Sequence, residues 1–272
     1  MTSQPKISVI TVSFNAVDTI EETILSVINQ TYPNIEYIII DGGSTDGTVD
    51  IIKKYSNKIA YWISEPEKGI YDAMNKGALK ANGVYVQYLN ASDRIYSIYT
   101  IENIVSKLPV EKPNVVYGDI ILEKEFGTFH MTPEPLENFA YTFPIYHPSS
   151  WIKRELLLKF KFDTSFKIAA DFKLFHTIYY KNYSFYYIPI IFSIFEAING
   201  ISNTFAHRSW YESQIVLNKN KGLRWYINNY TFQIKEKIRR VLYHLIDIII
   251  PQFSLKRKYN GFMRNKYIKT RL

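Results

Sequence analysis

Four short polar clusters in this sequence contain residue types that bind nucleotides, phosphates and metal ions. They are residues 13–15 (S-F-N), 41–46 (D-G-G-S-T-D), 65–69 (E-P-E-K-G) and 90–93 (N-A-S-D). Each follows a run of β-branched and aromatic residues that is typical of a buried strand. Ligands of parallel α/β sheets bind beyond the carboxyl ends of the strands. We therefore expect the chemistry of this chain in these clusters.

Asp41 is the first candidate for ligand binding. It ends a predicted buried strand, so its carboxylate can accept a hydrogen bond from a uracil N3–H or a ribose hydroxyl. The alternative is a helix cap, a role for which Asp46 is better placed. Phe14 and Asn15 are expected to form the wall of this ligand site opposite Asp41, although a plain turn explains Asn15 equally well.

Lys68, Gly69, Asp72 and Asn75 surround the start of a predicted helix. Backbone N–H groups and the helix dipole attract anionic oxygens at such a position. Asp72 and Asn75 are one turn apart and are expected on the same side of the helix. An N-terminal cap is the alternative role for Asp72.

The elements that must position these clusters alternate between strand and helix. Strands are predicted over residues 7–13, 35–40, 59–63 and 84–89, and helices over residues 19–29, 48–55 and 71–81. This alternation predicts an α/β fold with a doubly wound, mostly parallel sheet flanked by helices.

The pattern is less regular beyond Asp93. Helices are predicted over residues 98–108, 149–159 and 171–180 and strands over residues 115–122 and 186–195, while residues 123–148 are irregular. From Asn203 to about Ile250 the sequence is helical and amphipathic. The length of 272 residues allows one main domain with a helical extension. The chain has no cysteine, which excludes disulfides and thiolate metal sites.

Several ordered motifs resemble those of family 2 glycosyltransferases, which have the GT-A fold. They are I-S-V-I-T-V-S-F-N, I-E-Y-I-I-I-D-G-G-S-T-D-G-T, E-P-E-K-G-I-Y-D-A-M-N-K-G, Y-L-N-A-S-D, Y-H-P-S-S-W and A-A-D-F. The resemblance implies a catalytic domain over residues 1–205, with a donor half (1–97) and an acceptor half (98–205), and a helical extension over residues 206–272. It implies a donor nucleotide site made by Val12, Ser13, Phe14, Asn15, Asp41, Gly42, Lys68, Gly69, Asp72, Asn75, Asn90, Ala91 and Ser92.

The resemblance also implies a divalent metal ion, Mn²⁺ or Mg²⁺, held by Asp93. Asp93 matches the last acidic position of the family's metal motif, whereas Ser92 replaces a residue that is commonly acidic. One carboxylate can still hold such a cation together with diphosphate and water. Loss of metal dependence is the alternative.

Asp171 is the catalytic base that the resemblance implies. A sugar hydroxyl is a poor nucleophile, so inversion by direct displacement needs a carboxylate that removes its proton. An ordinary helix cap is the alternative, and Asp163 is the substitute candidate for the base. The acceptor or phosphate side is expected to contain His147, Ser149, Trp151, Ser202, His207 and Arg208.

Residues 219–272 carry fourteen Lys and Arg against two carboxylates, and nine aromatic residues. Their net charge of +12 contrasts with −4 for residues 1–218. This composition favours binding to an anionic membrane surface; an oligomer contact, such as a homodimer, is the alternative, and nucleic acid is not expected. The polar N-terminus does not resemble a signal peptide, so we expect a cytoplasmic protein, peripheral on the inner face of the cytoplasmic membrane.

These features predict an inverting glycosyltransferase that moves a sugar from a nucleotide-sugar, with a UDP-sugar favoured, to a glycan or lipid-linked acceptor in cell-surface polysaccharide assembly. A non-catalytic nucleotide-sugar binder or scaffold of the same fold is the alternative. A dinucleotide-dependent oxidoreductase is not supported, because no G-x-G-x-x-G follows the first strand.

Overall fold

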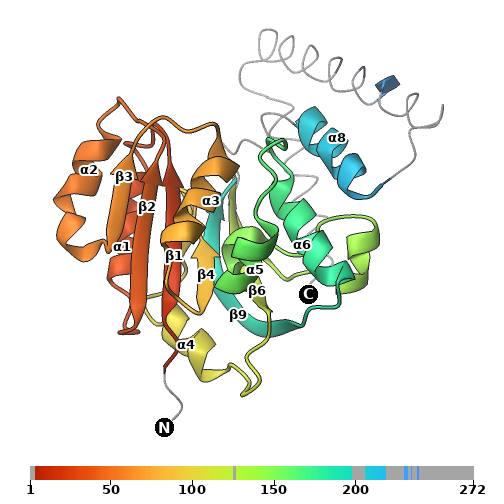
Figure 1. Cartoon of the computed structure of the whole chain (residues 1–272), viewed down its shortest axis with the longest axis horizontal. Helices are drawn as coiled ribbons and strands as arrows, with labels where there is room; N and C mark the ends of the chain where they lie inside the picture. The colour runs from red at the N-terminus through yellow and green to blue at the C-terminus, as the bar shows by residue number, and fades with distance from the viewer. Residues whose placement is uncertain are drawn as a thin grey trace.

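The computed structural model describes residues 4–124, 127–197 and 206–218, together with residues 230, 231, 234 and 238 (Figure 1). Its strands are β1 (Ile7–Ser13), β2 (Ile35–Asp41), β3 (Tyr61–Ser64), β4 (Tyr85–Tyr88), β5 (Arg94–Ile95), β6 (Val115–Lys124), β7 (Gly127–Met131), β8 (Ser150–Lys153) and β9 (Phe185–Glu196). Its α-helices are α1 (Ile20–Ile28), α2 (Thr48–Lys54), α3 (Ile70–Lys80), α4 (Thr100–Ser106), α5 (Arg154–Phe160), α6 (Ala170–Tyr180) and α8 (Ala206–Val216). Short 3-10 helices are η1 (Ser56–Lys58), η2 (Leu136–Ala140) and η3 (His147–Ser149).

The strands form one sheet in the order β3-β2-β1-β4-β8-β6-β9-β5, and β7 pairs with β6. β1 to β4 are mutually parallel, as the strand and helix alternation predicts. β8 runs antiparallel between β4 and β6, β5 is antiparallel to β9, and β7 is antiparallel to β6. The sheet is therefore mixed rather than mostly parallel.

Helices cover both faces of this sheet (Figure 1). One apolar core contains side chains of α3, α5 and α6, and the other contains side chains of α1, α2 and α4. α3 lies very close to the sheet, because a Cβ added at Gly77 would be 2.5 Å from Ile10 Cγ2. Gly77 thus allows the second half of α3 to pack directly on the middle of β1.

Two sequence predictions for the second half are wrong. Residues 149–159 were expected to form one helix, but Ser150–Lys153 form β8 before α5 begins. The strand is favoured because Trp151 is fully buried in the sheet and donates its indole N–H to Gln87 Oε1 at 2.9 Å. Residues 123–148 are not uniformly irregular, since β7 extends the edge of the sheet by pairing with β6.

The helical extension predicted beyond Asn203 begins with α8, which packs against α6 (Figure 1). Apart from the few isolated positions, residues 219–272 lie outside the described part of the chain. Among the helices that the structure describes, none is both long enough and apolar enough to span a bilayer.

Candidate active site

The polar clusters meet at one edge of the sheet because the strands before them are parallel. Ser13, the last residue of β1, pairs in register with Asp41, and Asp41 pairs with Ser64 of β3. The turn after β4 joins them, since Ala91 N–H donates to the Val12 carbonyl at 3.1 Å. This edge is the upper one in Figure 1.

Asp41 is fully buried and accepts hydrogen bonds from the last residues of β1 and β3 and from the loop after β2. Its Oδ1 accepts from Ser13 Oγ (2.8 Å) and Ser44 Oγ (2.6 Å), and its Oδ2 accepts from Ser64 Oγ (2.6 Å) and the Gly43 and Ser44 amides (3.1 and 2.8 Å). Burial alone raises the pKa of Asp41, but these hydrogen bonds outweigh it and hold the pKa below its usual value. The charged carboxylate thus ties these segments together. Direct contact with a nucleoside stays a prediction and requires one of the serines to turn away.

Asn15 and Phe14 form the wall beside Asp41. Asn15 has a left-handed backbone (φ 46°), and its Oδ1 accepts a hydrogen bond from the Thr45 amide at 3.0 Å. Phe14 is 66% exposed and lies next to Gly42, where an added Cβ would be 3.3 Å from the ring. The exposed ring offers a flat apolar surface to a ligand. Asp46 Oδ1 accepts hydrogen bonds from the amide and the hydroxyl of Thr48, the first residue of α2, but the capping position of α2 is Gly47 rather than Asp46.

The start of α3 lies at the same edge. Asp72 Oδ2 accepts a hydrogen bond from the Lys68 amide at 3.3 Å, which lies just before the capping residue Gly69. Asn75 does not share this environment: its side chain donates to the Phe162 carbonyl and accepts from the Phe162 amide, both at 2.8 Å. The two polar atoms of Asn75 therefore join α3 to the acceptor half, and its role in donor binding stays a prediction.

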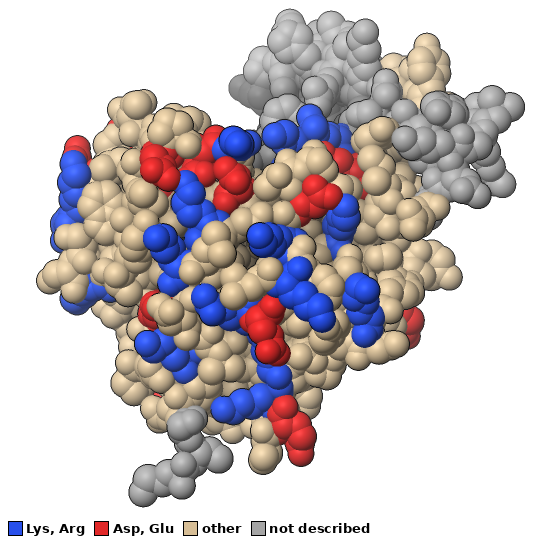
Figure 2. All heavy atoms as spheres, viewed as in Figure 1, with Lys and Arg blue, Asp and Glu red and all other residues tan. Residues whose placement is uncertain are grey.

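Lys167 provides a positive charge near the start of α3, although it lies in none of the sequence motifs. A Cβ added at Gly69 would be 4.0 Å from Lys167 Nζ, so the ammonium lies beside the first turn of α3. Lys76, in contrast, is paired with Glu65 and Glu67, and these hydrogen bonds raise its pKa. Figure 2 shows Lys and Arg side chains spread over the face that α3, α5 and α6 cover, with Asp and Glu gathered nearer the upper edge.

Asp93 is fully buried in the turn after β4. Its Oδ2 accepts a hydrogen bond from the Asn90 amide at 3.2 Å, and its Oδ1 accepts from the Glu196 amide at 3.3 Å. Burial raises the pKa of Asp93 to about 7, while the nearby His147 acts in the opposite direction. Without a bound cation, the carboxyl of Asp93 therefore titrates near neutral pH.

The Asn90–Asp93 turn has the donor atoms that a hard divalent cation prefers. Within the described residues, the buried side-chain Oδ1 of Asn90 has no hydrogen-bond partner. An unpaired amide oxygen and a carboxylate in one short turn are suitable ligands for Mg²⁺ or Mn²⁺. In the described part of the chain, no three or more His, Cys, Asp or Glu side chains are arranged so that they could hold a metal ion. Such a cation would therefore take its other ligands from phosphate and water. Ser92 is half-buried in the same turn.

Asp171 lies in the first turn of α6, and His147 connects it to the Asn90–Asp93 turn. Asp171 Oδ2 is 3.3 Å from His147 Nδ1, and His147 Nε2 is 3.4 Å from Asn90 Nδ2. The tautomer that satisfies both contacts carries its proton on Nδ1, donates to Asp171 and accepts from Asn90. Histidine 147 therefore links the predicted base to the predicted metal site, two groups that the sequence places 78 positions apart.

Tyr71 is a second side-chain neighbour of Asp171, and no sequence motif indicates this contact. Its hydroxyl lies 3.2 Å from Asp171 Oδ1 and also within hydrogen-bond distance of the Ile168 carbonyl. Burial, together with the charge of Asp171, raises the pKa of Tyr71. Tyr71 follows directly after the K-G-I segment, but nothing in its own spacing indicates a partner in α6.

Asp163, the substitute candidate, has a different environment. Its side chain accepts hydrogen bonds from Lys173 Nζ and from Ser165. The Lys173 contact, helped by Ser165, lowers the pKa of Asp163 to about 2. A carboxylate with so low a pKa is a weak base, which favours Asp171.

The other residues predicted for the acceptor or phosphate side do not gather at Asp171. Trp151 is a correction, since its side chain is buried in the sheet and hydrogen-bonded to Gln87. Ser149 is another, because it is fully buried and bonded to Ser193 Oγ at 2.7 Å. Arg208 binds Glu212 at 2.9 Å. Ser202 and the side chain of His207 lie outside what the structure describes.

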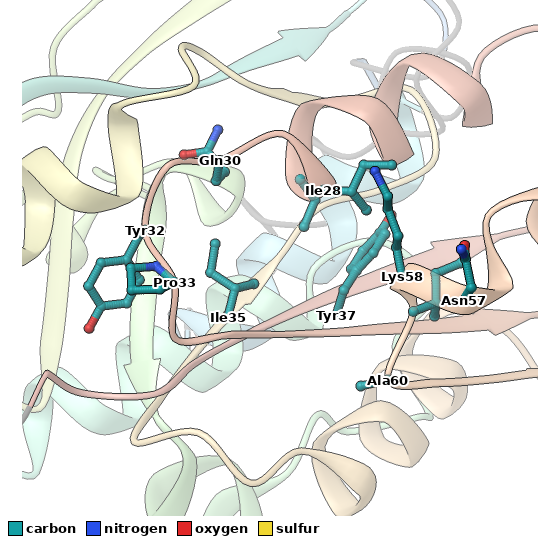
Figure 3. Close-up of a pocket in the computed structure, with 11 residues that line it drawn as sticks. Ile28, Gln30, Tyr32, Pro33, Ile35, Tyr37, Asn57, Lys58 and Ala60 are labelled. Carbon is teal, nitrogen blue, oxygen red and sulfur yellow. The ribbon is translucent and has the colours of Figure 1, made fainter.

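A hollow of about 420 Å³ lies elsewhere on the molecule, between the end of α1 and η1 (Figure 3). Its lining includes Gln30, Tyr32, Ile35, Tyr37, Lys58 and Ala60. Ile35 begins β2, whereas Asp41 ends it. The hollow is therefore at the opposite edge of the sheet and is not part of the candidate site.

Solved structures resemble this fold. The Staphylococcus aureus protein TarS (residues 1–349, in complex with UDP-GlcNAc) superposes with a TM-score of 0.62 at 20% identity, covering 78% of this chain and 65% of that one. The mannosyltransferase PcManGT of Pyrobaculum calidifontis, in complex with GDP-Man and Mn²⁺, gives 0.62 at 22% identity, covering 81% and 66%. The chain thus spans less than two thirds of that TarS chain and about two thirds of PcManGT.

Sequence comparisons identify the family. An uncharacterized glycosyltransferase of Mycobacterium tuberculosis is 36% identical over 177 residues, covering 63% of this chain and 68% of that protein. A PGL/p-HBAD biosynthesis glycosyltransferase of Mycobacterium bovis is 24% identical over 231 residues, covering 81% and 88%. The family model described as "Glycosyl transferase family 2" matches residues 8–178, which is more than half of the chain. The protein belongs to glycosyl transferase family 2 and has its GT-A fold.

Proposed function

We propose that this glycosyltransferase is an inverting, divalent-metal-dependent enzyme that transfers a sugar from a nucleotide-sugar donor to a hydroxyl of a glycan or lipid-linked acceptor. The observation that carries the proposal is the contact between Asp171 and His147, with His147 also touching Asn90 in the turn that contains Asp93. It puts a partly exposed carboxylate near a turn with oxygen ligands. A base and a charge-stabilising group on opposite sides of one reacting centre are what direct displacement requires.

In the proposed reaction, Asp171 accepts the proton of the acceptor hydroxyl as that oxygen attacks the anomeric carbon. The bond from the anomeric carbon to the diphosphate breaks in the same step, so the configuration inverts. His147 holds Asp171 by its Nδ1–H, and Tyr71 holds the other carboxylate oxygen. Asn90 Oδ1 and Asp93 would hold the cation, which neutralises the departing diphosphate when bound.

On the donor side, Phe14 and the loops fixed by Asp41 are proposed to hold the nucleoside. Lys68 and Lys167, at the start of α3, are proposed to face the diphosphate. A UDP-sugar is favoured, and the TarS complex with UDP-GlcNAc supports a uridine nucleotide. The PcManGT complex contains GDP-Man and Mn²⁺. It therefore supports a divalent metal ion, and GDP-sugars must be tested as donors beside UDP-sugars.

A role in cell-surface polysaccharide assembly is supported by two relatives. One is the PGL/p-HBAD biosynthesis glycosyltransferase, and the other is a putative teichuronic acid biosynthesis glycosyltransferase of Bacillus subtilis, 43% identical over 94 residues, covering 34% of this chain and 37% of that protein. Lipid-linked acceptors lie at a membrane, and the basic residues 219–272 are proposed to hold the enzyme at its anionic inner face.

The test is a transfer assay with UDP-, GDP- and dTDP-sugars and a lipid-linked acceptor fraction, with and without Mn²⁺. We expect transfer from one donor class, dependence on the metal, and a product whose anomeric configuration is opposite to that of the donor. Retention of configuration would refute the direct displacement. Ser92 in the metal motif favours the non-catalytic binder as the second candidate, and nucleotide binding without turnover on any donor would support it.

A further inference from the structure

Glu212 in α8 is a buried carboxylate that none of the predicted site residues accounts for. It is 4% exposed, although it belongs to a helix of the C-terminal extension. Its two oxygens accept hydrogen bonds from three consecutive backbone amides: Lys167 (3.0 and 3.1 Å), Ile168 (2.8 Å) and Ala169 (3.0 Å). Arg208, one turn earlier in α8, donates to the same carboxylate at 2.9 Å.

These three amides immediately precede α6, where a helix needs acceptors for its free N–H groups. The residue in the capping position is Ala169, which has no side-chain acceptor to offer. Glu212 supplies an acceptor for the Ala169 amide from 43 positions further along the chain, while the Phe172 amide inside the first turn donates to Asp171 Oδ1 at 2.8 Å. A negative charge at this end of a helix is also stabilised by the helix dipole.

The carboxylate of Glu212 is charged in this setting. Burial alone raises its pKa, but the hydrogen bonds from Arg208 and from the three amides outweigh burial and hold the pKa below its usual value. Charged acceptors form stronger hydrogen bonds with backbone amides than neutral ones do. The contact is therefore a strong connection between α8 and the segment 167–169.

This segment determines where Asp171 lies. Asp171 follows Ala169 by two residues, in the first turn of α6. The Ile168 carbonyl is within hydrogen-bond distance of the Tyr71 hydroxyl, which also reaches Asp171 Oδ1. The backbone that Glu212 holds thus contacts the same tyrosine that contacts the base. Lys167, whose ammonium lies beside Gly69, belongs to the segment as well.

We propose that Glu212 is a positioning residue for Asp171, and that α8 is a working part of the active site rather than an appendage. The inference rests on the proposed role of Asp171 as the base. It also moves the functional boundary of the catalytic unit beyond residue 205, so that it includes at least residues 206–218. A shift of the base by about 1 Å is enough to reduce the rate by about 100-fold.

The experiment compares full-length Glu212→Ala and Glu212→Gln with a matched control, Glu36→Gln. Glu36 is also a part-buried carboxylate that accepts from a backbone amide, that of Asn82, and from a hydroxyl, that of Ser8. It lies near the start of β2, at the edge of the sheet away from Asp171. We expect kcat per folded molecule to fall about 10- to 100-fold in Glu212→Ala, with a smaller change in the donor KM because Lys167 belongs to the same segment. The loss of kcat should be less in Glu212→Gln and small in Glu36→Gln.

Amide hydrogen exchange gives a second reading that needs no substrate. In Glu212→Ala we expect faster exchange at the amides of residues 167–169, with the amides of β1 and β2 unaffected. Unchanged exchange there overturns the contact itself, and faster exchange with an unchanged kcat overturns the positioning role. An equal loss of kcat in Glu36→Gln also overturns it, because the effect is then one of general stability. If Glu212→Ala shows faster exchange at residues 167–169 but the wild-type protein transfers no sugar, the result contradicts the proposed function instead.

Discussion

The proposed donor side and the proposed catalytic side of this site hold their acidic groups in different ways. Asp41 is fully buried, and hydroxyls and amides from the last residues of β1 and β3 and from the loop after β2 occupy both of its oxygens. The Asp171 side chain is 16% exposed, and its neighbours Tyr71 and His147 come from α3 and η3. The donor side is thus a fixed platform built from adjacent strands. The catalytic side keeps a carboxylate that a ligand can reach, held by contacts between distant segments.

This difference between the two sides predicts that a substitution of Asp171 causes the largest loss of activity. Asp171→Asn keeps the shape of the side chain but cannot accept a proton, so we expect kcat to fall by about 10³-fold or more. Nucleotide binding, which uses the donor side, should be retained. The matched variant is Asp163→Asn, whose carboxylate is already paired with Lys173. Transfer rates of the two variants check the assignment, and a greater loss in Asp163→Asn would reverse it.

At Asp41 we expect a loss of stability instead. Asp41→Ala leaves three hydroxyls and two amides without their acceptor in a buried place, which should cost on the order of 3 kcal/mol of unfolding free energy. Urea unfolding measures this. Asp50→Ala is the control, because the side chain of Asp50 is 82% exposed and its ion pair with Lys53 is weak. Equal stability of the two variants would show that the donor side is not the rigid platform described above.

His147 should have an intermediate effect on catalysis. Without its ring, Asp171 loses the group that orients one oxygen, so His147→Ala should lower kcat about 10- to 100-fold. His147→Gln retains a side-chain N–H donor, and partial recovery of kcat is expected. Steady-state kinetics with both variants distinguish orientation from packing. If both variants lose activity equally, or neither does, the link through His147 is not functional.

Asp93 should give a smaller, pH-dependent effect on the metal-free protein. Its pKa is about 7 when folded against 3.8 for the free side chain, so its contribution to stability is lost as pH rises from about 4 to 7. Asp93→Asn has no such loss, and we expect its melting temperature to exceed that of the wild type by about 2 °C or more at pH 8 but not at pH 4. Thermal unfolding at both pH values measures this. If the melting temperatures of the variant and the wild type differ by the same amount at pH 4 and pH 8, the pKa of Asp93 is not raised by burial.

The sequence predicts the donor side better than the catalytic side, for a physical reason. β1 and β2 are runs of mostly apolar, β-branched residues, and α3 has a helical period. Asp41 ends β2 and Asn90 follows β4 closely, at the edge where parallel strands bring polar residues together. β8 has only four residues, too few to show alternation, so the sequence predicts the start of a helix there. Tyr71 and Glu212 are recognisable only through partners about 100 and 43 positions away, and no local spacing encodes such contacts.

The most direct test of the account is the thermal stabilisation of the wild-type protein by UDP, GDP, dTDP and CDP, each with and without Mn²⁺. A ligand that binds only the folded state raises its stability by mass action, by about 2.7 kcal/mol at 100 times its Kd. We predict an increase with UDP that depends on Mn²⁺ and that Asp93→Asn abolishes. No increase with any nucleotide, with or without the metal, would contradict a nucleotide-sugar site at this edge of the sheet.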